Sequence, residues 1–98
     1  MGTGKSGAYG KEVSVVATGT IRLFPDLRGR WLIRFRNLDA TVSIFVGEGD
    51  VDDTGALKGA EIKAGEAVYG VVVDPDNIYA IVATGTVLVS AFACRTGD

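Results

Sequence analysis

Short apolar runs, some alternating with polar residues, recur at intervals of roughly ten residues along this chain, and no stretch has helical periodicity. The clearest run spans residues 31–36. Because successive side chains of a strand point to opposite faces, this run divides into two sets. They are Trp31, Ile33 and Phe35 on the predicted core face, and Leu32, Arg34 and Arg36 on the other.

The same pattern predicts a series of short strands separated by Gly, Pro, Asn and Asp residues that favour turns. The predicted strands are Val13–Thr18, Thr20–Phe24, Arg30–Asn37, Val42–Gly47, Ala60–Lys63, Ala67–Val73, Ile78–Ala83 and Thr86–Ala93. A chain of 98 residues can bury one core. We therefore expect an all-β protein, a single small two-sheet β-sandwich of jelly-roll-like type.

The first residues differ from the rest in composition. Met1–Lys11 contains four glycines and little hydrophobic surface, so it is not expected to fold alone or to act as a signal peptide. We predict that residues 1–12 form an extended Gly-rich arm and that residues 13–98 form the sandwich domain. Three residues of the arm are candidates for contact with a partner: Lys5, Tyr9 and Lys11.

Composition disfavours several classes of function. The chain has no His and one Cys, Cys94, so no Ser-His pair, Cys-His pair or Cys/His zinc site can form within it. We expect no enzyme activity, no catalytic residues and no cofactor. A net charge of −2 disfavours nucleic acid as a partner, and no apolar run is long enough to span a membrane. A lone cysteine suits a reducing cytoplasm, and Cys94 is expected to be buried.

An acidic segment over residues 50–61 resembles a calcium-binding loop in part. Asp50, Asp52 and Glu61 occupy the first, third and twelfth positions of such a loop. The flanking segments are predicted strands, whereas this type of loop normally joins two helices. The alternative, which we favour, is a solvated acidic loop without a metal ion.

Arginines are concentrated in the predicted strand over residues 30–37 and just before it. Arg34 and Arg36 share one face of that strand, where they could bind carboxylates of a partner protein. The alternative is that they pair within the chain, with Asp50, Asp52 or Asp53. The aromatic residues are expected in the core, with a sugar-stacking platform as the alternative.

Two predicted strands are apolar on both faces. Val68–Val73 and Val87–Phe92 carry hydrophobic residues at consecutive positions, although a sandwich strand needs only one apolar face. The second apolar face indicates contact with another subunit. We therefore expect a homo-oligomer.

The order and spacing of several motifs resemble small β-sandwich proteins of tailed bacteriophages. The shared pattern is a strand that ends in Asn, a strand that ends in Gly, a loop, a Gly-Glu turn and a closing hairpin. These motifs cover roughly residues 30–93. They are Arg30–Asn37, Val42–Gly47, Gly55–Gly59, Ile62–Glu66 and Ile78–Val87.

The resemblance implies a virion protein of the capsid decoration or cement type. Such a protein is made in the host cytoplasm and binds the major capsid protein at the capsid surface, often as a homotrimer. The resemblance supplies no catalytic residues. The alternative function is a fibre or tail module that binds a host receptor or glycan through the loops Asp50–Gly59 and Asp74–Asn77.

Overall fold

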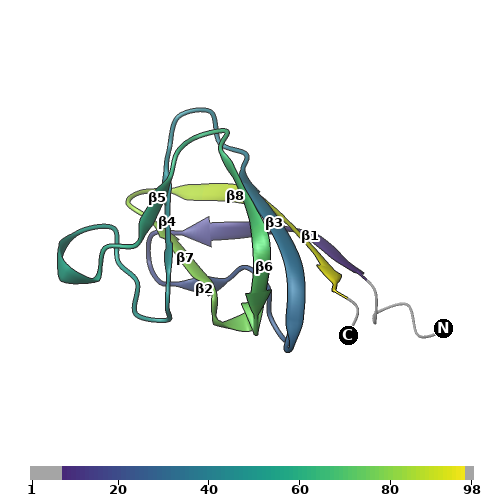
Figure 1. Cartoon of the computed structure of the whole chain (residues 1–98). Helices are drawn as coiled ribbons and strands as arrows, with labels where there is room; N and C mark the ends of the chain where they lie inside the picture. The colour runs from purple at the N-terminus through teal and green to yellow at the C-terminus, as the bar shows by residue number, and fades with distance from the viewer. Residues whose placement is uncertain (1–7, 97–98) are drawn as a thin grey trace.

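Eight strands and two short 3-10 helices are present in residues 8–96, which are the residues that the computed structural model describes (Figure 1). The strands are β1 (Ala8–Val16), β2 (Ile21–Arg22), β3 (Arg30–Asn37), β4 (Ile44–Gly47), β5 (Ala60–Ile62), β6 (Ala67–Val73), β7 (Tyr79–Val82) and β8 (Thr86–Arg95). The helices are η2 (Gly55–Leu57) and η3 (Pro75–Asn77). Within these residues, no helix has the length and hydrophobicity needed to cross a membrane.

The strands pair antiparallel in a nested order, in which the first strand of the sequence pairs with the last and the fourth pairs with the fifth. β1 pairs with β8, β2 with β7, β3 with β6, and β4 with β5. Pairing of β3 with β8 and of β4 with β7 joins these ladders into two four-stranded sheets. The long sheet has the order β1-β8-β3-β6, and the short sheet has the order β2-β7-β4-β5. This is the strand order of a jelly roll, so the predicted all-β, two-sheet, jelly-roll-like sandwich is confirmed.

Each of the eight predicted strands corresponds to a strand of the structure. β3 and β6 have the predicted bounds, and the other strands differ by a few residues at their ends. The largest difference is at β1. It begins at Ala8, five residues before the predicted start at Val13.

The predicted arm over residues 1–12 is therefore wrong for residues 8–12. These residues belong to β1 and pair with β8, from Ala8 opposite Cys94 to Glu12 opposite Ser90. The physical reason is that β8 is ten residues long, and β1 bonds to its backbone on the side away from β3. Residues 1–7 lie outside the described residues.

The core lies between the two sheets and follows the predicted alternation of β3. Trp31, Ile33 and Phe35 are buried with 2–3% of their surface exposed, whereas Arg34 and Arg36 point to the solvent side. Other apolar side chains from both sheets and from the segment after β2 complete the core, including Val15, Leu23, Phe24, Ile44, Val82, Val87 and Val89.

The β3 strand ends at a buried polar residue, Asn37. Its Nδ2 donates to the carbonyl oxygens of Val42 at 2.8 Å and Ile62 at 3.1 Å, and its Oδ1 accepts the N–H of Asp39 at 2.9 Å. The side chain is completely buried. Asn37, at the end of β3 in the long sheet, is therefore hydrogen-bonded to β5 of the short sheet and to the segment that leads into β4.

Replacing Asn37 with Ala should lower the free energy of unfolding by about 2–4 kcal/mol, because two carbonyl groups lose their donor in a buried site. Denaturant unfolding followed by tryptophan fluorescence measures the change. Asn77→Ala is the control, since Asn77 is exposed. Equal stability of the two variants would contradict the structural role of Asn37.

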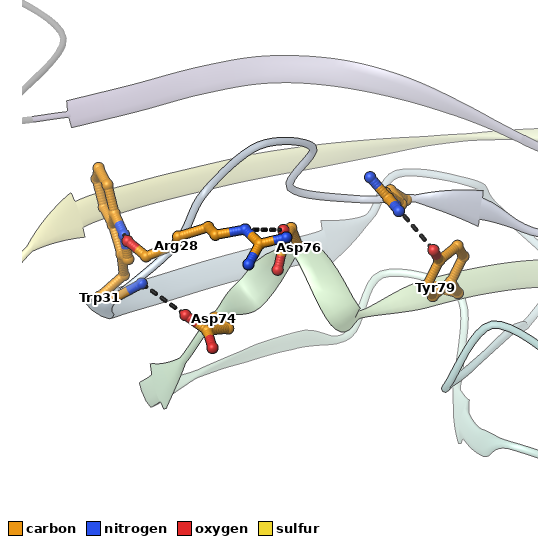
Figure 2. A network of polar contacts seen from close by, with 7 residues as sticks. Arg28, Trp31, Asp74, Asp76 and Tyr79 are labelled. Carbon is orange, nitrogen blue, oxygen red and sulfur yellow. Dashed lines mark hydrogen bonds and ion pairs between the residues drawn. The ribbon is translucent and has the colours of Figure 1, made fainter.

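A second polar cluster fixes the opposite end of β3, where it faces the turn between β6 and β7 (Figure 2). The N–H of Gly29 donates to Oδ1 of Asp74, and the N–H of Asp74 donates to the carbonyl of Gly29, both at 2.7 Å. Nε of Arg28 forms an ion pair with Oδ2 of Asp76 at 3.2 Å. Both ends of β3 are thus held by polar contacts.

The turn after β3 is organised by the carboxylate of Asp39. Its Oδ2 accepts the N–H of Thr41 at 2.9 Å and the N–H of Val42 at 2.8 Å. These backbone hydrogen bonds favour the charged form and lower the pKa of Asp39.

Because the folded state lowers this pKa, the carboxylate stabilises the fold fully above the ordinary pKa of aspartate. That contribution is lost as the pH falls through the lower, folded-state pKa. Asp39→Asn retains an oxygen acceptor but cannot ionise, so it should unfold with a weaker dependence on acid pH than the wild type. Unfolding free energies measured from neutral pH down to the acid transition test this, and parallel curves would contradict it.

Candidate docking surface

The outer face of the long sheet, which points away from the core, is formed by three neighbouring strands. The registers of β6, β3 and β8 place Tyr69, Arg34 and Phe92 in one row across the sheet. The row on one side contains Val71, Leu32 and Cys94, and the row on the other contains Ala67, Arg36 and Ser90. We call this surface the outer face and define it by Leu32, Arg34, Arg36, Tyr69, Val71, Leu88 and Phe92.

The outer face is more apolar than the solvent side of an antiparallel sheet usually is. Tyr69 is 76% exposed, Val71 51%, Phe92 47% and Leu88 45%. Exposed apolar side chains gathered on one face of a sheet mark interaction sites in soluble proteins.

The two arginines add positive charge to this apolar surface. Nε of Arg36 donates to the carbonyl of Gly65 at 3.1 Å. Arg34 and Arg36, together with Leu38, Ser90 and Phe92, line a hollow of about 250 Å³. An arginine beside an aromatic ring can bind a carboxylate while an apolar side chain of the partner packs on the ring.

The alternative that these arginines pair with the acidic loop is not observed. Arg28 and Asp76 form the one ion pair found in residues 8–96. Glu12 is on the same side of the long sheet as the two arginines, but Ser90 lies between it and Arg36, and no ion pair joins Glu12 to Arg36. The guanidinium groups of Arg34 and Arg36 are therefore available to acidic groups of a partner.

The predicted arm residues do not join Arg34 and Arg36 in one site. Lys5 lies outside the described residues. Tyr9 is in β1 on the core side, where its ring packs against Phe24 with centroids 6.1 Å apart. Burial raises the pKa of the Tyr9 phenol. At this position Tyr9 is partly buried and lines a hollow beside β1 and β2.

Lys11 lines the same hollow as Tyr9, of about 470 Å³, beside β1 and β2. Arg22 and Tyr79 line the same hollow, and Nε of Arg22 donates to the Tyr79 hydroxyl at 2.8 Å (Figure 2). Lys11 pairs with Ala91, a buried residue, so it is on the opposite side of the long sheet from Arg34 and Arg36. The structure thus divides the predicted partner-binding residues between two surfaces.

The calcium-loop candidate does not form a cluster of ligands. Oε2 of Glu61 accepts a hydrogen bond from Ser43 at 2.7 Å, and Glu61 itself lies in β5. Oδ1 of Asp52 accepts the N–H of Asp53. Across residues 8–96, no three His, Cys, Asp or Glu side chains converge as metal ligands would, and this holds for Asp50, Asp52 and Glu61.

Two features of the outer face differ from the sequence analysis or go beyond it. Cys94, expected to be buried, is only partly buried, on the outer side of β8, because it follows Phe92 by two positions. Tyr69 and Phe92 were expected in the core with the other aromatic residues, but both are exposed on the outer face, because they lie at outward positions of β6 and β8. Val71 and Leu88 were recognised only as members of strands with two apolar faces. Their convergence with the arginines depends on the register between β6, β3 and β8.

Comparisons with known proteins give no relative for this chain: no protein-family model, no curated protein and no solved structure matches it significantly.

Charge reversal on the outer face should leave the fold intact. Arg34→Glu with Arg36→Glu should change the free energy of unfolding by less than about 1 kcal/mol, because both side chains are exposed and Arg36 loses a single hydrogen bond. Thermal and denaturant unfolding of the double variant measure this. A loss of several kcal/mol would show that the arginines are part of the fold and not of a docking surface.

Proposed function

We propose that this protein is a non-enzymatic virion protein of a tailed bacteriophage that decorates or cements the capsid surface. The observation that supports the proposal is the outer face, on which Arg34 and Arg36 lie among exposed apolar side chains. The resemblance in the sequence supports the part of the proposal that concerns the phage and its capsid. The outer face supports the part that concerns attachment.

The chemistry of the outer face suits a protein partner with carboxylates. Burying Phe92, Leu88 and Leu32 against a partner removes apolar surface from water, at about 25 cal/mol per Å². Arg34 and Arg36 add bidentate hydrogen bonds to carboxylates, which fix the orientation of the partner. In this proposal the partner is the major capsid protein.

Attachment of this kind stabilises a shell by mass action. A protein that binds the assembled shell, and not its dissociated subunits, lowers the free energy of the assembled state. Several copies held together would bind with higher avidity than a single copy. The proposed form is a homo-oligomer, and the resemblance implies a homotrimer.

Co-sedimentation with phage capsids that lack this protein tests the proposal. The wild type should sediment at a fixed stoichiometry, and Arg34→Glu with Arg36→Glu should weaken binding at least tenfold, which is about 1.4 kcal/mol. Lys58→Glu with Lys63→Glu makes the same change of charge away from the outer face and serves as the control. A wild type that stays in the supernatant would exclude the capsid function.

The alternative function, a fibre or tail module, is favoured by a separate hollow. Glu48, Gly49, Asn77 and Tyr79 line about 440 Å³ where the segment before the Asp50–Gly59 loop meets the Asp74–Asn77 turn. An aromatic ring beside polar groups is a surface to which sugars bind. A glycan array distinguishes this function: binding that Tyr79→Ala abolishes, with capsid attachment absent, would support it.

A further inference from the structure

The β6 strand is an open edge of the long sheet. It pairs with β3 on one side and with no strand of residues 8–96 on the other. At the two ends of the β3–β6 ladder, the N–H of Asn37 donates to the carbonyl of Glu66, and the N–H of Asp74 donates to the carbonyl of Gly29. Hydrogen-bonded pairs alternate along an antiparallel ladder. Every second residue of β6 therefore has its backbone N–H and C=O groups directed away from β3. These residues are Ala67, Tyr69, Val71 and Val73.

The other sheet edges have features that prevent pairing with another chain, and β6 has none of them. Edge strands are usually short or carry charged residues, Pro or a bulge. β1 contains Lys11 and Glu12, β2 has two residues, and β5 has three residues including Glu61. β6 has seven residues, all of them uncharged and none of them Pro.

We propose that β6 pairs antiparallel with β6 of a second copy of this chain, about a two-fold axis at Gly70. The two long sheets then form one continuous sheet. This inference deepens the homo-oligomer part of the proposed function and rests on that part alone, not on the capsid partner. It replaces the three-fold symmetry that the resemblance implies with a two-fold one.

The register with Gly70 at the axis gives every outward backbone group of β6 a partner. Tyr69 then faces Val71 of the second copy in a hydrogen-bonded pair, and Ala67 faces Val73 of the second copy in another. Aromatic and β-branched residues in such cross-strand pairs stabilise a sheet. The exposed surfaces of Tyr69, Val71 and Val73 would all decrease.

The inner side of β6 fits the same arrangement. Val68 and Val72 line an apolar groove of about 450 Å³, which also contacts Val46 of β4 and Ile62 of β5. The pairing places Val72 of the second copy beside Val68, at this groove. Gly70 has no neighbour within 4 Å of the position that a Cβ would occupy, so no contact inside the described chain requires a glycine there.

The mass of the purified protein in solution, without capsids, tests the pairing. Light scattering should give twice the 10.2 kDa of one chain at high concentration. Tyr69→Pro removes an N–H that points away from β3, so it should convert the dimer to a folded monomer, because edge strands tolerate Pro at such positions. Val71→Lys places a charge in the paired strand and should weaken the dimer at least tenfold, as a second variant in case Tyr69→Pro does not fold.

Leu88→Lys is the matched control. It puts the same charge on the same face at an apolar residue of similar exposure, but on β8, which is inside the sheet. It should leave the dimer mass unchanged. A monomer at all concentrations, a trimer, or a dimer that persists in both Tyr69→Pro and Val71→Lys would overturn the inference. A monomer would also exclude the homo-oligomer of the proposed function, but capsid attachment itself is tested separately by co-sedimentation.

A disulfide at the axis tests the register. In a Cys94→Ser background, Gly70→Cys places two cysteines opposite each other in a pair without hydrogen bonds, with Cα atoms about 4.5 Å apart. That separation lies within the range that disulfides span. Mild oxidation should give a covalent dimer, whereas Val68→Cys in the same background places the cysteines roughly 13 Å apart along the strand and should not. Equal cross-linking of the two variants would exclude this register.

Discussion

The alternation of side chains along β3 is the constraint on which both the core and the outer face depend. β3 lies between β8 and β6, and its inward residues Trp31, Ile33 and Phe35 contact the core. The same period of two sends Arg34 and Arg36 outward. A shift of β3 by one residue would turn the guanidinium groups of Arg30, Arg34 and Arg36 toward the core and expose Trp31, so core packing also keeps the candidate docking surface in place. The polar contacts of Asn37 and Asp74 at the two ends of β3 hold it in this register.

Much of the fold followed from local pattern, and most of the candidate surface did not. Strand positions depend on alternation and on turn residues within about ten positions, so β3 and β6 were predicted with their bounds. Which strands are neighbours depends on contacts between distant segments, so the row of Tyr69, Arg34 and Phe92 could not be predicted. The same limit explains the error over residues 8–12. The glycine and charged residues of this segment, taken alone, indicate an extended arm. Residues 8–12 form a strand because they pair with β8, which lies more than seventy residues later in the sequence.

The long sheet has two candidate binding surfaces, the outer face and the edge at β6, and they point in different directions. The outer face presents side chains perpendicular to the sheet, and in the proposed function its arginines would select acidic partners. The edge at β6 presents backbone groups within the plane of the sheet, and in the proposed dimer it would pair with an extended uncharged strand. A chain that pairs through β6 keeps the part of its outer face on β3 and β8 accessible, and the two copies would present their arginines on one continuous surface. If the proposed function holds, such an arrangement would offer a capsid two identical attachment sites at a fixed distance.

The position of β8 determines when this protein can fold during its synthesis. β8 is the last of the eight strands to leave the ribosome, yet it lies inside the long sheet between β1 and β3. Until it arrives, β1 has no neighbour in the sheet and β3 is bonded along one side only, so the nascent chain cannot close its core. The open β6 edge is therefore exposed next to an unfinished sheet during that interval. In the proposed dimer, rapid pairing of this edge with β6 of a second copy would protect newly made chains from aggregation.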